Sequence, residues 1–409
     1  MNVLYYDFLN LEDHGNEATH IYEVLSNLSK LGHNVVLLNR GRLTNAKEIQ
    51  LPQQPSRWRG IRGSLRSVPV FRFVEGEITV AWRLVREIQT FIVVLVAMMR
   101  RKVSPDVVYM RHDLFNGGYS LARLFRVPVV KEVNGILVDE MRAKNEGSSA
   151  LLWAISHIER FSLPRGSKII AVTSKLKEVL HDNYNVPEDK IVVIQNGANT
   201  DLFKPMDEAE ARRKLNLNQG NDYICFVGSL VKWQGIEYLI KSMPLILERC
   251  PDIRLLIVGD GIMKNELIEL AKQIGLSDKI IFTGKVPYHK VPLYINASDV
   301  CVLPKTPLKS GYSPLILYEY MACAKPVVAT RTSGLEILEE YNAGLLFHPM
   351  DTQELADAVT TLLKNGELKR RLGKNGRKYV VENQSWASVA QRIADVSEGL
   401  IGRKGIGKQ

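Results

Sequence analysis

Several common signatures of catalytic and metal sites are absent from this chain of 409 residues. There is no Asp-x-Asp pair, and no group of histidines and cysteines has the spacing of a zinc site, so we expect no metal ion. There is neither a Gly-x-Gly-x-x-Gly fingerprint after a strand nor a Walker A motif, which argues against NAD-dependent enzymes and P-loop kinases. We therefore expect no bound cofactor.

Cysteines and long apolar runs are also scarce. The four cysteines form no Cys-x-x-Cys pair, which favours reduced thiols in a cytoplasmic protein. The opening residues MNVLYYDF contain no basic region followed by an apolar stretch, so we expect no secretory signal. The apolar run Phe91–Met99 has nine residues, too few to cross a bilayer. We expect a cytoplasmic protein, and its charge suggests a peripheral position at the inner face of the membrane.

That charge is concentrated in one window. Ten basic and three acidic residues lie between residues 57 and 102, so this window accounts for +7 of the net charge of +10. Aromatic residues are interleaved with the basic ones, which suits an anionic membrane surface. Nucleic acid would fit the charge, but no nucleic-acid motif accompanies it, and the simpler alternative is a helical flap with solvated arginines. The residues assigned to this membrane or acceptor surface are Arg57, Trp58, Arg59, Arg62 and Arg66.

Apolar strand-like segments alternate with helical segments in two successive series along the chain. This order predicts two doubly wound, Rossmann-like α/β domains with parallel sheets, facing each other across a cleft at the carboxyl ends of their strands. We expect the first domain over residues 1–203, a linker over 204–222, the second domain over 223–385, and a C-terminal helix with a basic tail over 386–409 that crosses back to the first domain. Strands are expected at 2–6, 34–38, 106–110, 127–133, 168–172 and 191–194, and then at 223–227, 254–258, 280–282, 300–303, 326–329 and 344–347.

One expected helix of the second domain, over residues 314–324, is apolar on nearly every face and is therefore predicted to be buried. Ser313 suits its N-cap and Pro314 its first position. Glu319 is its only charged residue. Because an unpaired buried carboxylate is strongly unfavourable, Glu319 is a candidate ligand-binding residue, with a structural partner inside the protein as the alternative.

Glycine-bearing loops follow several strands of the second domain. They are FVGSLVKWQG (226–235), IVGDG (257–261), SGYSP (310–314) and TSGLE (332–336). Glycine at a strand end lets backbone N–H groups approach an anion, and a following helix adds its dipole. Several such loops at one sheet edge suit a nucleoside diphosphate.

These segments resemble glycosyltransferase family 4, whose members have the GT-B fold. The resemblance covers nearly the whole chain, and it implies a retaining, metal-independent transfer of a sugar from a nucleotide-sugar donor to a glycan or lipid-linked acceptor, in cell-envelope polysaccharide or glycoconjugate synthesis. The stretches that carry it are KIIAVTSKLKEVLHDNYNVPEDKIVVIQNGANTDLFKP, FVGSLVKWQGIEYLIKSMPLI, LLIVGDG, IIFTGKVPYHKVPLYINASDVCVLP and SPLILYEYMACAKPVVATRTSGLEILEEYNAGLLFHPMD.

The resemblance also assigns the donor site. It implies that Glu319 holds the ribose hydroxyls. Gly311 stands where the family has another glutamate, so backbone amides are the candidates to bind the sugar hydroxyls in its place. Ser229 and Gln234 stand where the family places cations for the diphosphate, so nearby lysines are candidate substitutes. The implied donor-binding residues are Glu319, Gly311, Tyr312, Ser313, Ser229, Lys232, Gln234, Lys309, Val286 and Pro287, with Lys305 as a further candidate cation.

Other residues are assigned to the acceptor and the transferred sugar. Gly15 and Asn16 match a loop that faces the acceptor and the diphosphate, although Asn16 also suits a helix N-cap. Asn134 falls where many members carry a histidine, and His112 follows a strand; together with Glu336 they are the candidate catalytic residues. The alternatives are a structural or surface role for His112 and a helix cap for Glu336. No nucleophile is required if the acceptor hydroxyl attacks on the leaving-group face, with donors aimed at the diphosphate stabilising the developing charge.

Two other functions stay open at this point. A GT-B nucleotide-sugar epimerase would need acid–base carboxylates or histidines in the cleft. A degenerate subunit that binds a nucleotide or a partner without turnover would fit the residues at Gly311, Ser229 and Gln234. The sequence does not indicate the base, the sugar, the acceptor, the linkage or the oligomeric state.

Overall fold

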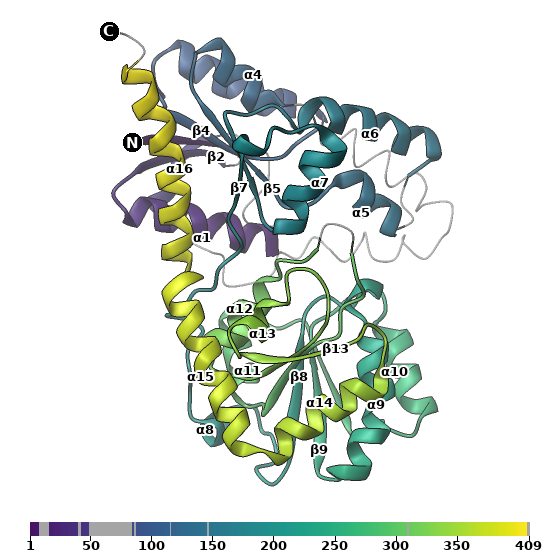
Figure 1. Cartoon of the computed structure of the whole chain (residues 1–409). Helices are drawn as coiled ribbons and strands as arrows, with labels where there is room; N and C mark the ends of the chain where they lie inside the picture. Colours follow the sequence, from purple (N-terminus) through teal and green to yellow (C-terminus); the bar gives the residue numbers. More distant parts are fainter. Residues whose placement is uncertain are drawn as a thin grey trace. The chain divides into compact units, whose positions relative to one another are not determined.

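The computed structural model describes residues 1–7, 16–39, 42–48, 84–85, 87–114, 116–144, 147–308 and 311–406. The chain divides into two compact units, one made of Met1–Gln195 with Val389–Gln409 and the other of Asn196–Ser388 (Figure 1). The polar segment 204–222, expected as a linker, belongs to the second unit and contains helix α8 (Glu208–Lys214). Arg212 anchors this segment, because its guanidinium donates to Ala297 O at 2.9 Å and to Asp299 Oδ2 at 2.8 Å.

The first unit contains a seven-stranded sheet in the order β3-β2-β1-β4-β5-β6-β7. All neighbouring strands are parallel except β2 and β3, which pair antiparallel. The sequence did not predict β3, because its four residues RLTN contain one apolar side chain and give no strand pattern. The strands are β1 (Asn2–Tyr6), β2 (Asn34–Asn39), β3 (Arg42–Asn45), β4 (Val107–Arg111), β5 (Val129–Val133), β6 (Lys168–Ala171) and β7 (Ile191–Val193).

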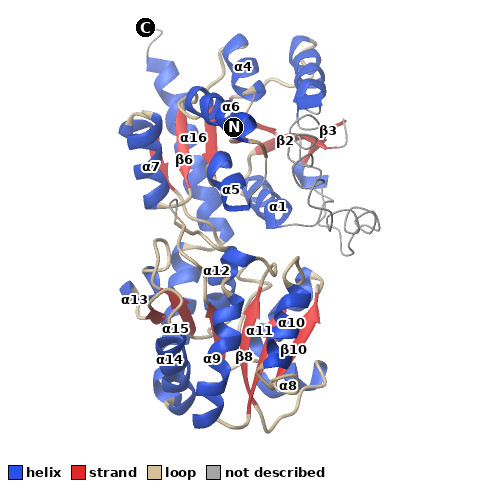
Figure 2. Cartoon of the chain, turned by 90° about the vertical axis from the view of Figure 1, so that its right-hand side faces the viewer, coloured by secondary structure: helices blue, strands red, loops and turns tan. Residues whose placement is uncertain are grey.

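Helices cover both faces of this sheet (Figure 2). One face packs against α4 and the helical residues 87–99, and another core cluster joins the sheet to α5, α6 and α7. Buried residues on both faces explain why its strands read as nearly continuous apolar runs. The helices are α1 (Asn16–Lys30), α4 (Gly117–Leu124), α5 (Leu137–Lys144), α6 (Ser149–Ser162) and α7 (Ser174–Tyr184).

The second unit contains a six-stranded parallel sheet in the order β10-β9-β8-β11-β12-β13. The chain builds outward from β8 to β10 and then returns to the other side of β8 to begin β11. The strand order therefore reverses between β8 and β11, and ligands of such sheets bind outside the carboxyl ends of the strands at that point. The strands are β8 (Asp222–Val227), β9 (Ile253–Val258), β10 (Ile280–Gly284), β11 (Val300–Leu303), β12 (Val327–Thr330) and β13 (Gly344–Phe347).

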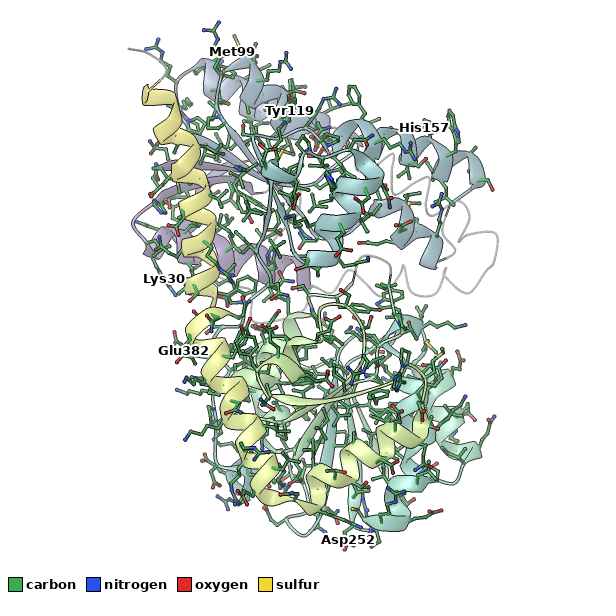
Figure 3. The ribbon with its side chains drawn as sticks, viewed as in Figure 1. Lys30, Met99, Tyr119, His157, Asp252 and Glu382 are labelled. Carbon is green, nitrogen blue, oxygen red and sulfur yellow. The ribbon has the colours of Figure 1, made fainter. Side chains whose placement is uncertain are left out.

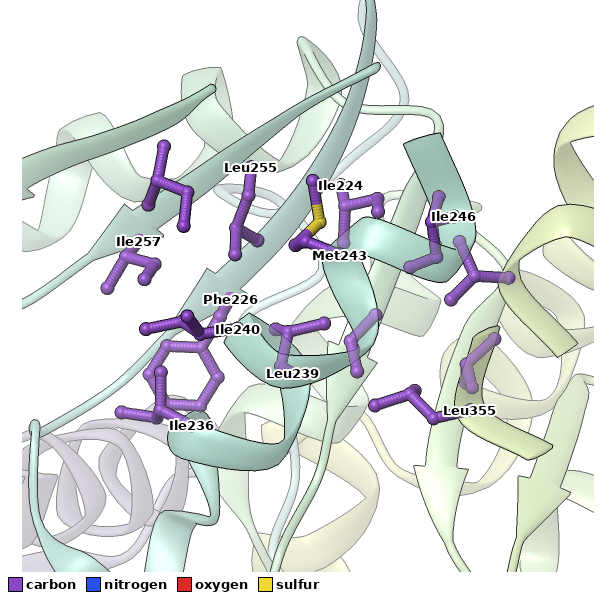
Figure 4. Packing of buried hydrophobic residues seen from close by; sticks show 14 of the residues in the cluster. Ile224, Phe226, Ile236, Leu239, Ile240, Met243, Ile246, Leu255, Ile257 and Leu355 are labelled. Carbon is purple, nitrogen blue, oxygen red and sulfur yellow. The ribbon is translucent and has the colours of Figure 1, made fainter. Parts of the chain in front are cut away.

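Two core clusters cover the two faces of this sheet. On one face α9 (Ile236–Arg249), α10 (Lys264–Gln273) and α14 (Thr352–Lys364) pack, and on the other α11 (Val291–Asn296), α12 (Leu315–Ala322) and α15 (Gly366–Asn383). Figure 4 shows side chains of α9 beside those of β8 and β9, including Ile236, Leu239, Ile240, Met243, Ile224, Phe226, Leu255 and Ile257.

Helix α12 is buried, as its composition predicts, because α15 covers the side that faces away from the sheet. The sequence did not predict α15, which is rich in charge and contains three glycines. The glycines serve close packing: a Cβ at Gly373 would lie 2.0 Å from Ala324 O, and one at Gly376 would lie 3.2 Å from Met321 Cγ. The short α13 (Ile337–Glu340) belongs to the second unit, and the final helix α16 (Trp386–Ile406) begins there and continues into the first unit from Val389 onward.

Among the residues that the structure describes, no helix has both the length and the apolar character needed to cross a membrane. The same described residues contain no cluster of three or more His, Cys, Asp or Glu side chains that could hold a metal ion.

Candidate functional site

Two loops meet at the point where the strand order of the second unit reverses. One follows β8 and the other follows β11, and Thr306 N in the second donates to Trp233 O in the first at 3.1 Å. Gly235 has a φ of +66°, and a Cβ on it would lie 1.8 Å from Pro304 O. Only glycine allows this approach, so the two loops are in direct contact at the carboxyl edge of the sheet.

Lys305 lies in the second of these loops, two residues after the end of β11. Its side chain is 4% exposed, and its Nζ donates to Gln234 Oε1 at 2.7 Å. The Nζ also stands 4.7 Å from the centre of the Tyr312 ring. Burial lowers the pKa of Lys305 to about 7. The sequence named Lys305 as one lysine among several, and only the structure distinguishes it by burial.

The other expected cations and loop residues occupy different surroundings. Ser229 and Lys232 are exposed, and Gln234 is half-buried beside Gly228. The β8 loop is fixed to the β9 loop, because Leu230 N donates to Asp260 O at 3.0 Å. Lys309 lies outside the described residues.

The amides of Gly311, Tyr312 and Ser313 were expected to face a ligand, and for the first two the structure differs. Gly311 N donates to Leu308 O at 3.1 Å, and Tyr312 N donates to Ser333 O at 2.8 Å. Both amides are therefore already bonded within the protein. Gly334 makes this possible, because its φ is +94° and a Cβ there would lie 1.8 Å from Tyr312 O.

The start of α12 also differs from the prediction. The helix begins at Leu315, and Pro314, with φ −74° and ψ 125°, is its N-cap in place of Ser313. Ser313 is used instead to hold the beginning of the second unit. Its Oγ accepts from Asn196 N at 3.1 Å, and its carbonyl accepts from Asn196 Nδ2 at 2.6 Å.

Glu319 is 6% exposed, and the Tyr288 hydroxyl donates to its Oε1 at 2.9 Å. Tyr288 begins a short 3-10 helix, η5 (Tyr288–Lys290), that follows Val286 and Pro287. Val286 and Tyr288 both pack on the core cluster that contains α12. The structure thus brings Glu319 together with the turn after β10, whose Val286 and Pro287 were also among the implied donor-binding residues. Sequence reasoning did not single out Tyr288, although it lies inside the segment IIFTGKVPYHKVPLYINASDVCVLP that carries the family resemblance.

Glu336 is exposed, and its Oε2 accepts from Gly334 N at 2.6 Å. The carboxylate therefore fixes the turn before α13. Glu336 occupies the N-cap position of α13, but its side chain makes no capping bond, and the contact with Gly334 gives the carboxylate a partner other than a sugar.

The candidate residues Asn134 and His112 each lie beside a carboxylate of the first unit. Asn134 follows β5, and its Nδ2 donates to Glu132 Oε1 at 2.6 Å. His112 Nε2 lies 3.8 Å from Glu159 Oε1, and burial lowers the pKa of this histidine, which favours the neutral ring. The Glu159 carboxylate accepts from Leu137 N at 2.7 Å and thereby fixes the start of α5. Gly15 lies outside the described residues, as does the side chain of Asn16, the first residue of α1.

A second polar cluster of the first unit was not predicted at all. The carboxylate of Glu87 is buried, and its Oε1 accepts from Tyr6 OH at 2.9 Å and from Gly117 N at 3.0 Å. Lys131 is fully buried in β5, and its Nζ donates to Ser162 O at 2.7 Å. Burial raises the pKa of Glu87 to about 8 and lowers that of Lys131 to about 7. These charges escape sequence reasoning because a single polar residue in a strand or helix gives no sign of its burial.

We expect Glu87→Gln to remove a pH-dependent loss of stability. The unfolded carboxyl titrates near 4.5 and the folded one near 8, so Glu87 stabilises the fold fully below about pH 4.5 and loses that contribution as the pH rises to 8. Glutamine keeps the acceptor for Tyr6 and Gly117 and does not titrate. The variant's melting temperature should match wild type near pH 4.5 and exceed it by about 10 °C at pH 8.5, since a pKa raised from 4.5 to about 8 corresponds to about 5 kcal/mol.

Scanning calorimetry from pH 4.5 to 9 measures this difference. Lys131 titrates in the same range, so each variant is compared with wild type at the same pH. Glu178→Gln, which changes an exposed carboxylate of the same unit, is the control and should give a constant difference. A Glu87→Gln difference that does not grow with pH would contradict the assigned protonation.

The chain matches two family models, one described as "Glycosyltransferase Family 4" over residues 18–202 and one described as "Glycosyl transferases group 1" over residues 207–379. An uncharacterized glycosyltransferase of Methanocaldococcus jannaschii is 30% identical over 300 residues, which cover 71% of this chain and 74% of that protein. The alpha-D-kanosaminyltransferase of Streptomyces kanamyceticus is 24% identical over 287 residues, which cover 68% of this chain and 72% of that protein.

Solved structures resemble the whole chain. Sucrose-phosphate synthase from Thermosynechococcus elongatus has a TM-score of 0.69 at 20% identity, covering 98% of this chain and 99% of its own. Anabaena HepE in complex with UDP has a TM-score of 0.69 at 19% identity, covering 98% of this chain and 100% of its own. The expected fold, two Rossmann-like domains of the GT-B type, is confirmed.

Proposed function

The chain belongs to glycosyltransferase family 4, and from that premise we propose that it transfers a sugar from a nucleotide-sugar donor to a glycan or lipid-linked acceptor. We propose further that the transfer retains anomeric configuration, needs no metal ion, and serves cell-envelope polysaccharide or glycoconjugate synthesis at the cytoplasmic face of the membrane. The observation that carries the proposal is that Glu319, buried in the helix after β11, accepts from Tyr288 in the turn after β10, since both segments follow the carboxyl edge of the second sheet.

The donor is proposed to lie along this edge of the second unit. Its ribose hydroxyls donate to Glu319, and its base lies along the turn that contains Val286 and Pro287. Its diphosphate lies over the joined loops that follow β8 and β11, where glycines keep side chains out of the way. Support comes from Anabaena HepE, which shares the fold and has been solved with UDP and glucose.

The test is a transfer and hydrolysis assay of the purified full chain with UDP-, GDP- and ADP-sugars. Release of the nucleoside diphosphate with one of these donors, and formation of a glycosylated product with retained configuration, are the expected results. Binding of a nucleotide with no turnover of any donor would favour a subunit that has lost activity. Conversion of the donor sugar without transfer would favour an epimerase.

A lipid-linked acceptor is supported by an apolar stripe on the helix over residues 87–99. Ile88, Ile92, Val96 and Met99 recur at helical spacing, and their side chains are 51%, 53%, 39% and 68% exposed. Met99, labelled in Figure 3, lies at the outer edge of its unit. Arg100, Arg101 and Lys102 follow the stripe and are all exposed. An apolar helical face that ends in a cluster of positive charge suits an interface with anionic lipids. The residues Arg57, Trp58, Arg59, Arg62 and Arg66 lie outside the described part of the chain.

We expect the full chain to bind vesicles that contain phosphatidylglycerol at low salt and to leave them at high salt, because the basic cluster is screened. Replacing Ile88 and Ile92 by serine should weaken binding about tenfold, since two exposed apolar side chains are lost from the interface. Vesicle flotation measures the bound fraction. Ile262→Ser, at an exposed isoleucine of the second unit, is the control. Equal binding of both variants, or no binding by wild type, would contradict the membrane proposal and leave the transferase proposal standing.

A further inference from the structure

Lys305 is a buried cation whose described partners are all neutral. Its ammonium bonds the amide oxygen of Gln234 and faces the ring of Tyr312. None of the ion pairs within the described part of the chain includes it. Burial alone accounts for the lowered pKa of this lysine, with no charged group contributing to it.

Such a residue is costly to keep. An ammonium without a counter-charge loses its hydration on burial, and an apolar side chain of similar length would fill the same space more favourably. A bound anion would favour the charged form of the Lys305 ammonium and offset the free-energy cost of burying it. A buried, uncompensated charge at a ligand-binding edge is therefore better explained by a ligand than by stability.

The surroundings indicate where that anion lies. Lys305 stands at the strand reversal, on the loop that is bonded to the β8 loop through Thr306 and Trp233. The Gln234 side chain extends from the ammonium toward Gly228: its Oε1 accepts from Lys305 Nζ at 2.7 Å, and its Nε2 would lie 3.4 Å from a Cβ added to Gly228. Gly228 is half-buried and has no side chain, which is the condition under which an anion can approach backbone N–H groups closely.

Among the described residues, the other expected sources of positive charge have different surroundings. The amides of Gly311 and Tyr312 are bonded to carbonyls of the protein, and Lys232 is exposed to solvent. We propose that Lys305 is the residue that neutralises the diphosphate of the donor, with Gln234 positioning its ammonium. This inference rests on the proposed function, because it takes the anion to be the diphosphate of a nucleotide sugar. During transfer, the same charge stabilises the diphosphate as it leaves.

Isothermal titration calorimetry tests the assignment with the nucleoside and the nucleoside diphosphate of whichever base the wild-type chain binds best. Lys305→Met should raise the Kd for the diphosphate at least 30-fold and change the Kd for the nucleoside less than threefold. Lys241→Met is the matched control, because Lys241 also stands near a tyrosine ring, with its Nζ 5.9 Å from the centre of Tyr238, but is exposed. It should leave both constants unchanged.

A swapped variant adds a result that a purely structural role does not explain. Gln234 and Lys305 touch, so Gln234→Lys combined with Lys305→Gln returns the charge to nearly the same place. Its Kd for the diphosphate should be within fivefold of wild type. Should Lys305→Met fail to fold, this double variant decides: recovery supports the proposal, and a 30-fold loss overturns it.

The outcomes separate the two proposals. Wild-type chain that binds none of the three nucleoside diphosphates would overturn the proposed function and this inference together. Tight diphosphate binding that Lys305→Met leaves intact would overturn only the role of Lys305. A variant that binds the diphosphate normally but the whole nucleotide sugar 30-fold more weakly would also overturn it, because the charge would then serve the sugar.

Discussion

Glu319→Ala should raise the Kd for the nucleotide-sugar donor about 100-fold, which makes binding undetectable at ordinary concentrations. A carboxylate that accepts from two ribose hydroxyls contributes about 2.8 kcal/mol, since bonds to charged groups are stronger than neutral ones and each 1.4 kcal/mol is a factor of ten. The loss should be as large for the nucleoside as for the diphosphate, because the ribose is common to both. This pattern distinguishes Glu319 from Lys305, whose removal should affect only the diphosphate.

Titration calorimetry with purified variants measures these constants. Tyr288→Phe should have a smaller effect, about fivefold, because it removes one hydrogen bond that orients the carboxylate and leaves the charge in place. Glu248→Gln, at an exposed carboxylate of the same unit, is the control for a change of charge. If Glu319→Ala binds the donor like wild type, Glu319 is not part of the site.

Gly235→Ala should unfold the second unit at a temperature about 10 °C lower than wild type and abolish transfer. The added methyl group would lie 1.8 Å from Pro304 O, and the φ of +66° is itself unfavourable for alanine. The loops after β8 and β11 would have to separate, at a cost of more than about 3 kcal/mol. Activity should fall with stability, because Lys305 and Gln234 lie on these two loops.

Gly275→Ala is the matched control for this prediction. Gly275 also has a positive φ, +73°, but a Cβ there would meet no atom within 4 Å. The substitution should therefore cost only the unfavourable backbone conformation, about 1 kcal/mol, and lower the melting temperature by about 3 °C. Circular dichroism on heating measures both variants. Similar losses at the two positions would mean that the contact with Pro304 does not hold the loops together.

Much of the fold follows from local patterns in the sequence. Alternating apolar segments predict the parallel strands of both units because side chains in a strand buried on both faces are apolar throughout. The same reasoning predicts α12 as a buried helix and singles out Glu319, since one acid in an apolar helix stands out without any knowledge of its neighbours. The missed elements are those with little local signal, namely β3, α8 and the charged, glycine-bearing α15.

The sequence by itself determined which residue types stand at the carboxyl ends of the strands, and it is on these residue types that the prediction of a nucleotide site rests. The tertiary structure decided which of them are available to a ligand. In the structure, the amides of Gly311 and Tyr312 are bonded to protein carbonyls, Ser313 is hydrogen-bonded to Asn196, and Lys305 is buried against Gln234. These outcomes depend on contacts between segments far apart in the chain, and burial and hydrogen bonding are set by such contacts, which no local pattern of residues records.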